Sequence, residues 1–193
     1  LFNRSEKYID LKEYIKNFEG FRIEKTHFKI GTKIHSEDFY YAKRLFQNSF
    51  YTTRMAMLLA IKIKEELRDT TEKVLLVGYE MYSELLLSLT EKFLKYLGFE
   101  DEKVKHFIMQ NDDENFKFLP DTTFKTFLKE YRTNRTVIIV PIAATGSTIK
   151  KVESDIKREI LRYEKIENKK AEQDARKLAE SYSFKLRYII LLA

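Results

Sequence analysis

The sequence has 193 residues, no cysteine, and a formal net charge of +6 with a pI of about 9.2. This length suits one domain, and the lack of cysteine excludes disulfides, thiolate zinc ligands and thiol nucleophiles. The 36 basic and 30 acidic residues are interleaved rather than clustered. Interleaved charge is typical of solvated helix faces, so we do not expect nucleic acid as a partner.

The hydropathy pattern argues against a membrane protein. The longest apolar runs have the length of a strand, well short of the roughly 20 residues that a membrane span needs. No signal-peptide pattern opens the sequence. We therefore predict a cytoplasmic protein without a membrane partner.

The first third of the sequence predicts a helix, a short strand or hairpin, and a long helix. Apolar residues follow helical spacing from Ser5 to Phe18, whereas residues 21–30 alternate apolar and polar side chains. From Phe50 to Leu67 the helical pattern is so rich in apolar residues that we expect a well-buried helix. The apolar positions that carry this last prediction are Met55, Leu58, Leu59, Ile61, Ile63 and Leu67.

Strands and helices alternate through the middle of the sequence. Residues 73–78 (KVLLVG) form a continuous apolar run that ends at Gly78, which is typical of a strand covered on both faces. The polar stretch 111–121 is predicted to be a loop. The remaining elements expected here are a helix at 83–97, a strand at 104–110, a helix at 122–132 and a strand at 137–140.

The C-terminal part predicts one more helix, a charged segment and a last strand. An apolar stripe runs from Ile149 to Tyr163, charges dominate 164–180 as a second helix or an exposed extension, and 184–193 is apolar. Alternating strands and helices predict an α/β fold with an open, mainly parallel sheet and helices on both faces. We expect a single domain over 1–193, with an N-terminal helix, small strands and a charged helical extension at 164–181.

The stretch 137–151 (VIIVPIAATGSTIKK) leads a strand through a small-residue loop into a helix. At such a position backbone N–H groups, hydroxyls and the positive end of the helix dipole converge, which suits a phosphate. The sequence has neither a Walker A loop nor a G-x-G-x-x-G fingerprint, and an ordinary strand-to-helix turn stays open as an alternative. The candidate phosphate-binding residues are Ala143, Ala144, Thr145, Gly146, Ser147 and Thr148.

Three stretches in the right order resemble type I phosphoribosyltransferases, in particular the orotate type. The small-residue loop after 137–140 is similar to the phosphoribosyl pyrophosphate motif, which holds a 5′-phosphate in that family. Residues 28–45 resemble the N-terminal pattern of the orotate enzymes, and 74–98 resemble the strand, pyrophosphate loop and helix before the motif. The resemblance implies a pyrophosphate or metal loop formed by Tyr79, Glu80, Tyr82 and Ser83.

The sequence departs from this family at the two positions before the small-residue loop. Active members carry two adjacent acids there, which hold the ribose hydroxyls and help to orient magnesium. Here these positions are Pro141 and Ile142, whose side chains neither carry charge nor accept hydrogen bonds. Two lost charge-assisted hydrogen bonds of about 1.5–3 kcal/mol each weaken sugar binding. No catalytic residue is assigned, and Mg²⁺ is expected only if the protein is active.

The charged and aromatic residues near the predicted site have two interpretations each. Glu80 is either a carboxylate of the site or the N-terminal acid of the next helix, and Tyr79 and Tyr82 either stack on a ligand or pack under the sheet. Lys103 and Lys105 fit surface lysines, and His106 fits a strand histidine better than a general base.

Three functions follow from these observations. The first is a non-catalytic module that binds a nucleotide or sugar phosphate through the retained loop. The second is a divergent, active phosphoribosyltransferase in which another acid, such as Glu80 or Glu84, replaces the missing pair. The third is a structural interaction module whose partner is another protein or a further domain of the same polypeptide. A homodimer is compatible with all three.

Overall fold

The structure is a computed structural model that describes part of the chain. The described residues are 22–23, 28–30, 34–36, 39–40, 46–67, 73–112, 115–119, 121–130, 135–140, 147–182 and 186–189. The helix that we predict at 5–18 lies outside them.

One five-stranded sheet organises the described part of the chain, with its strands in the order β7-β6-β5-β8-β9. Four strands run parallel, and β7 pairs antiparallel with β6 at one edge. The strands are β5 (Val74–Tyr79), β6 (Val104–Asp112), β7 (Asn115–Leu119), β8 (Arg135–Val140) and β9 (Leu186–Ile189).

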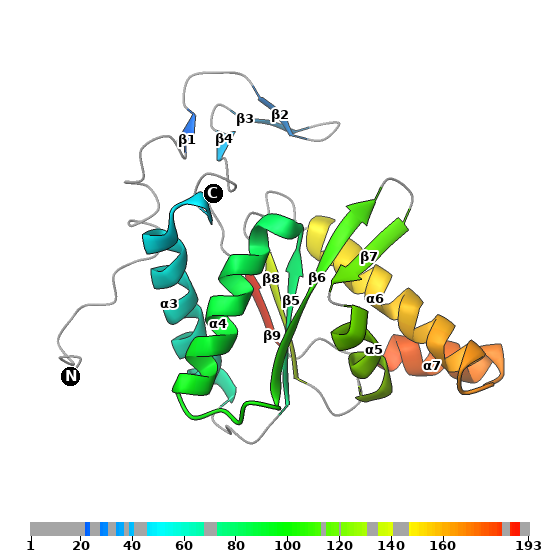
Figure 1. Cartoon of the computed structure of the whole chain (residues 1–193). Helices are drawn as coiled ribbons and strands as arrows, with labels where there is room; N and C mark the ends of the chain where they lie inside the picture. The colour runs from blue at the N-terminus through cyan, green and yellow to red at the C-terminus, as the bar shows by residue number, and fades with distance from the viewer. Residues whose placement is uncertain are drawn as a thin grey trace.

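Helices cover both faces of this sheet (Figure 1). One face packs against α3 (Ser49–Leu67) and α4 (Glu84–Tyr96). The other packs against α5 (Asp121–Glu130), α6 (Ser147–Ile166) and α7 (Glu172–Ser181). The α/β fold with a mainly parallel, open sheet is therefore confirmed.

The two cores arise from the alternation of side chains along the strands. Leu76, Ile108 and Ile139 face α3 and α4, whereas their neighbours Val77 and Val140 face the other three helices. Because both faces are buried there, β5 and residues 137–140 of β8 are continuously apolar, which is the pattern that predicts a parallel sheet of this kind.

Helix α3 has one buried face rather than burial all round. Met55, Leu59 and Ile63 are buried against the sheet, while Leu58 and Ile61 are only partly buried. The helix begins one residue before the predicted start and ends at the predicted Leu67. Leu58 and Ile61 point away from the sheet on the 3.6-residue period, so the richness of the apolar pattern overstated the burial.

Gly78 does not end its strand as predicted, since β5 continues to Tyr79. A Cβ at Gly78 would lie 2.2 Å from Leu87 Cδ1 and 2.6 Å from Ser83 Oγ. The glycine is therefore needed because α4 packs directly against the end of β5, and not because the chain turns there.

The predicted loop at 111–121 was wrong. Strand β6 extends to Asp112, and β7 returns antiparallel beside it, with Met109 opposite Phe118. Phe118 stacks on Phe124 of α5 at 3.7 Å between ring centroids and meets Phe107 edge to face. These aromatic contacts bury the inner side of a strand whose polar residues favour a loop in the sequence.

Four short strands lie beyond the carboxyl edge of the main sheet (Figure 1). Strand β1 (Arg22–Ile23) pairs with β4 (Phe39–Tyr40), and β2 (Phe28–Ile30) pairs with β3 (Ile34–Ser36), both antiparallel. They account for the strand pattern that we predict at 21–30. None of the described helices is both long and apolar enough to cross a membrane.

The charged segment after Tyr163 divides between two helices. Helix α6 continues to Ile166, and the buried Glu164 carboxylate accepts hydrogen bonds from Lys170 and Asn168 in the turn that follows. Helix α7 then buries Ala175 and Ala179 in the core. A contact between this segment and another domain stays a prediction.

Candidate functional site

The strand order identifies the place where a ligand is expected. From β5 the chain crosses to β6 on one side, and from β8 it crosses to β9 on the other. In open parallel sheets ligands bind beyond the carboxyl ends of the strands where the order reverses. Here that point lies between the turn after β5, which begins at Glu80, and residues 141–146 after β8.

The predicted phosphate loop can be placed only through its neighbours. Residues 141–146, which include Ala143, Ala144, Thr145 and Gly146, lie outside the described part of the chain. Ser147 and Thr148 are the first two residues of α6, and their side chains are not described. The N-terminus of this 20-residue helix therefore follows the loop directly, with its free N–H groups and positive dipole end.

Glu80 has a strained backbone at the end of β5. Its φ of 68° and ψ of 149° lie in a region that residues with a Cβ rarely adopt. Its N–H donates to the Met109 carbonyl of β6 at 2.9 Å, which holds the strained peptide against the neighbouring strand. Strain of this kind persists only where the surroundings fix it, and it is concentrated at functional sites.

The Ser83 side chain forms hydrogen bonds within the turn that follows β5. Its hydroxyl is buried and donates to the carbonyl oxygens of Glu80 at 2.7 Å and Tyr79 at 3.2 Å. Its N–H also donates to the Glu80 carbonyl at 3.0 Å. This side chain therefore stabilises the backbone of the turn that follows β5.

Tyr79, at the carboxyl end of β5, is influenced by the carboxylates of Glu80 and Asp155. Burial, the charge of Glu80, a hydrogen bond with Glu80 and the charge of Asp155 all raise the pKa of its hydroxyl. The phenol therefore stays protonated at neutral pH, and its O–H serves as a donor.

Asp155 is a buried acid of α6 that the sequence did not reveal. It is 4% exposed, and its Oδ1 lies 3.0 Å from Arg158 Nη2. Within the described part of the chain its buried Oδ2 accepts no hydrogen bond. In the sequence Asp155 resembles the other acidic residues of a charged helix. Only its position beside the apolar stripe indicates that its side chain is buried.

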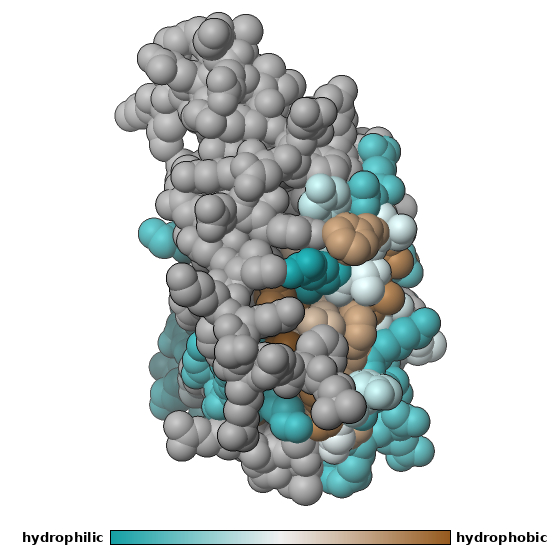
Figure 2. Space-filling view, turned by 90° about the vertical axis from the view of Figure 1, so that its left-hand side faces the viewer, coloured by the Kyte–Doolittle hydropathy of each residue, from teal (hydrophilic) through white to brown (hydrophobic). Residues whose placement is uncertain are grey.

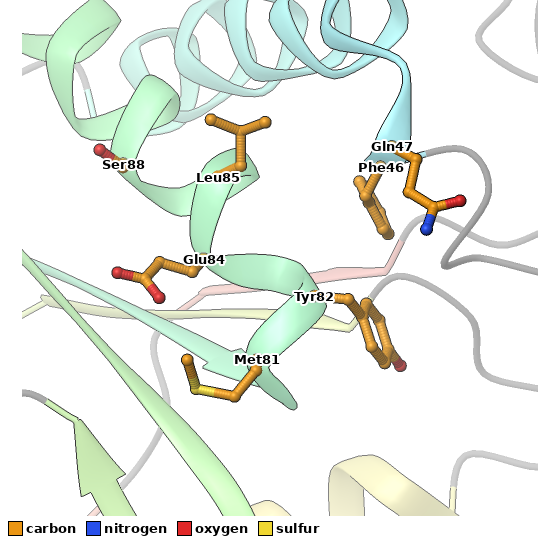
Figure 3. A pocket seen from close by; sticks show the side chains of 7 residues that line it. All are labelled: Phe46, Gln47, Met81, Tyr82, Glu84, Leu85 and Ser88. Carbon is orange, nitrogen blue, oxygen red and sulfur yellow. The ribbon is translucent and has the colours of Figure 1, made fainter.

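A hollow of about 520 Å³ opens beside the short helix η1 (Met81–Ser83) that leads into α4 (Figure 3). Tyr82 stacks on Phe46 with 5.9 Å between ring centroids and 13° between ring planes. Met81 and Leu85 add apolar surface, and Gln47, Glu84 and Ser88 add polar groups. Burial and then the charges of Glu80 and Tyr79 raise the pKa of Tyr82.

No protein-family model and no curated protein matches the sequence. In three dimensions the chain is similar to the crystal structure of orotate phosphoribosyltransferase from Aeropyrum pernix, with a TM-score of 0.50. The match covers 77% of this chain and 74% of that chain at 11% sequence identity. The fold is phosphoribosyltransferase-like. At this identity the similarity reaches no further than the fold.

Lys103, Lys105 and His106 lie at the amino end of β6 or just before it, away from this edge. His106 Nδ1 contacts Glu91 Oε2 of α4 at 2.6 Å, and Lys95 Nζ contacts Glu91 Oε1 at 2.6 Å. Lys103 pairs with Glu100 at 2.7 Å, and Lys105 is exposed. Among the described residues, no three acidic or histidine side chains gather in a way that suits a metal ion.

The structure thus brings only part of the predicted site together. Tyr79, Glu80, Tyr82 and Ser83 form one turn at the switch point, next to the strand that leads into the predicted phosphate loop. Phe46 and Asp155 were missed, because they reach this region from helices that are distant in the sequence.

Proposed function

We propose that this domain binds a nucleotide or sugar phosphate at the carboxyl edge of its sheet and does not transfer phosphoribose. The observation that carries the proposal is the position of α6, which begins directly after the small-residue loop at the reversal of strand order. Backbone N–H groups and the helix dipole suffice to hold a phosphate there without a charged side chain.

The acidic character of the β5 turn supports the lack of phosphoribosyl transfer. Residues 80–84 (EMYSE) carry two carboxylates and no basic side chain, which disfavours a pyrophosphate leaving group beside them. The positions occupied by Pro141 and Ile142 lack the acids that hold ribose in the family that this sequence resembles. A missing electrostatic partner at a reacting centre lowers a rate by roughly 10²–10³-fold.

Glu80 favours a second candidate, an active but divergent transferase. It places a carboxylate on strained backbone at the switch point, and strained residues are concentrated at active sites. In this alternative Glu80 replaces one of the missing acids, and Mg²⁺ is required. The two candidates differ in whether pyrophosphate is released.

Exposed apolar side chains favour a third candidate, an interaction module. Phe50 is 63% exposed, Met81 43% and Leu85 44%. Figure 2 shows apolar side chains gathered between hydrophilic ones on the side of the molecule that carries α3. Such residues are typical of protein interfaces, and in this alternative a protein or a further domain covers them.

Calorimetry with ribose 5-phosphate, phosphoribosyl pyrophosphate and nucleoside monophosphates tests the proposal. We expect binding without Mg²⁺ and no pyrophosphate release with any acceptor base. Gly146→Glu places a carboxylate in the phosphate loop and should abolish binding. Thr122→Glu adds the same charge to an exposed position at the start of α5 and serves as the control.

Each result separates the candidates. Magnesium-dependent pyrophosphate release would establish the divergent enzyme instead. If the folded protein binds none of these phosphates at millimolar concentration, the phosphate-binding function is lost and the interaction module remains. If Gly146→Glu and Thr122→Glu weaken binding equally, the ligand binds somewhere other than the loop.

A further inference from the structure

The hollow beside η1 has the dimensions and the lining of a small-molecule site. Its volume of about 520 Å³ falls within the roughly 300–1,000 Å³ of ligand pockets, which combine apolar surface with a few polar groups. Met81 and Leu85 line it with more than two-fifths of each residue exposed. Figure 3 shows Tyr82 and Phe46 on one side of the η1 turn and Met81 and Glu84 on the other.

This hollow lies at the same edge of the sheet as the proposed phosphate site. Met81, Tyr82 and Glu84 follow directly on β5, and β5 is the hydrogen-bonded neighbour of β8, from which the phosphate loop leads. Neighbouring strands lie about 4.8 Å apart. A ligand of nucleotide length is therefore long enough to bridge the carboxyl ends of β8 and β5, from which the phosphate loop and the turn beside the hollow lead.

The lining suits a flat ring with N–H groups on its edge. Tyr82 is held by its stacking on the buried Phe46, and with Met81 and Leu85 it offers a fixed apolar surface. Such surfaces accept any base through its ring face. The exposed Glu84 carboxylate accepts hydrogen bonds and donates none, so it favours amino groups and repels carbonyl oxygens.

We infer that this hollow binds the base of the phosphorylated ligand, and that Glu84 selects a base with an exocyclic amino group. The inference rests on the proposed function, because the phosphate of the same ligand is held at the loop after β8. Met81, Tyr82 and Leu85 contact the ring, and Glu84 accepts a hydrogen bond from the amino group.

Two pairs of nucleotides test the selection by Glu84. Guanosine and inosine 5′-monophosphate differ by one amino group, and cytidine and uridine 5′-monophosphate exchange an amino group for a carbonyl. By calorimetry on the full chain, we expect the amino member of each pair to bind about tenfold more tightly. Glu84→Gln should bring both ratios close to one, because an amide also donates to a carbonyl. Equal binding within both pairs by the unchanged protein would overturn the selection.

Truncation of the apolar side chains that line the hollow tests whether the base binds there. Met81→Ala combined with Leu85→Ala should weaken guanosine monophosphate about tenfold and leave ribose 5-phosphate unchanged. Tyr96→Ala, which removes an 89% exposed aromatic ring at the far end of α4, is the control. Circular dichroism checks that each variant is folded, which we expect because Met81 and Leu85 are each more than two-fifths exposed and lie outside the core.

The outcomes distinguish this inference from the proposed function. If ribose 5-phosphate binds but nucleotides bind no more tightly, the hollow does not hold the base and the phosphate site stands. If the truncated surface weakens ribose 5-phosphate and nucleotide equally, the inference also fails. If nucleosides bind at the hollow while ribose 5-phosphate does not bind, the base site stands and the phosphate function falls.

Discussion

Each of the two edges of the sheet carries a hollow, and the two hollows are lined by different kinds of residue. The hollow at the carboxyl edge, about 520 Å³, has an apolar lining and lies beside the strained Glu80. The hollow at the amino edge, about 260 Å³, lies between α5 and the first residues of β5 and β6. There the charges are matched locally, as in the Lys73–Glu130 pair at 2.7 Å.

This difference indicates at which edge of the sheet a ligand is expected to bind. At the amino edge, ion pairs between partly exposed side chains stabilise the protein weakly and do not require unusual backbone. At the carboxyl edge, a strained residue, a committed serine hydroxyl and a buried Asp155 oxygen coexist within one region. The strained backbone of Glu80 and the Asp155 oxygen that lacks a hydrogen-bond partner among the described residues lower stability, so their occurrence at one edge favours a binding role there.

The largest effect is expected at Gly78, where α4 meets the carboxyl edge. Gly78→Val places a Cβ 2.2 Å from Cδ1 of the buried Leu87, so this side chain and the packing of α4 on β5 must shift. We expect the free energy of unfolding in urea to fall by about 3 kcal/mol or more, at the upper end of overpacking effects. The turn that holds Glu80 should shift as well.

Gly98 provides the matched control for Gly78. It has a φ of 102°, but a Cβ added there meets no described atom within 4 Å. Gly98→Ala should therefore cost only backbone strain, about 1 kcal/mol. Equal losses at the two glycines would show that the close approach of α4 to β5 is not what requires Gly78.

The second prediction concerns the partly buried pair between α4 and β6. Burial raises the pKa of Glu91. The hydrogen bonds and charges of His106 and Lys95 together lower this pKa by more, so the net shift is downward. A lowered folded pKa stabilises the protein above the unfolded value near 4.5 and ceases to do so as the pH falls through the folded pKa.

Glu91→Gln should lower the free energy of unfolding by about 2 kcal/mol at pH 7, because charge-assisted hydrogen bonds are lost. The difference from the unchanged protein should shrink as the pH falls below 4.5 and through the lowered folded pKa. The control is Glu100→Gln, whose exposed pair with Lys103 should matter little. Urea unfolding between pH 7 and 3 measures both, and a pH-independent difference would contradict the linkage.

Ser83→Ala tests whether the serine supports the carboxyl edge. It removes the donor to the Glu80 and Tyr79 carbonyls, which should cost about 1–2 kcal/mol. Thr126→Ala removes a similar side-chain bond, from Thr126 to the Thr122 carbonyl, in an exposed part of α5 at the amino edge. Urea unfolding should show a distinctly smaller loss for that variant.

Glu80→Gly is expected to stabilise the protein. Glycine adopts the backbone of Glu80 without strain, and the relief of about 1–3 kcal/mol exceeds the extra entropy of glycine in the unfolded chain. We expect a net gain of about 1 kcal/mol, seen as a higher urea midpoint. A loss of stability would mean that the interaction of the Glu80 carboxylate with Tyr79 stabilises the fold by more than the strained backbone of Glu80 destabilises it.

The sequence predicts the parallel core well because burial on both faces leaves a direct signature. Each of β5 and β8 is a continuous apolar run, and the helices between them show the 3.6-residue period. Strand β7 has no such signature, since Phe118 finds its partners Phe107 and Phe124 only after the chain has folded back.

The candidate site was predictable only where it is local in the sequence. The turn from Tyr79 to Ser83 follows a strand, so its place at the carboxyl edge could be inferred from the pattern alone. The commitment of Ser83 to the backbone and the stacking of Tyr82 on Phe46 could not, because both depend on how helices pack in space.

The smallest effect is expected at the amino edge, where Lys73→Met breaks the pair with Glu130. Both side chains are more than two-fifths exposed, so solvent screens their attraction and the pair contributes about 0–1 kcal/mol. Urea unfolding at low and high salt should differ little between this variant and the unchanged protein, and phosphate or nucleotide binding should not change. A loss comparable to that of Ser83→Ala, or a change in ligand affinity, would mean that the amino edge shares the role that we assign to the carboxyl edge.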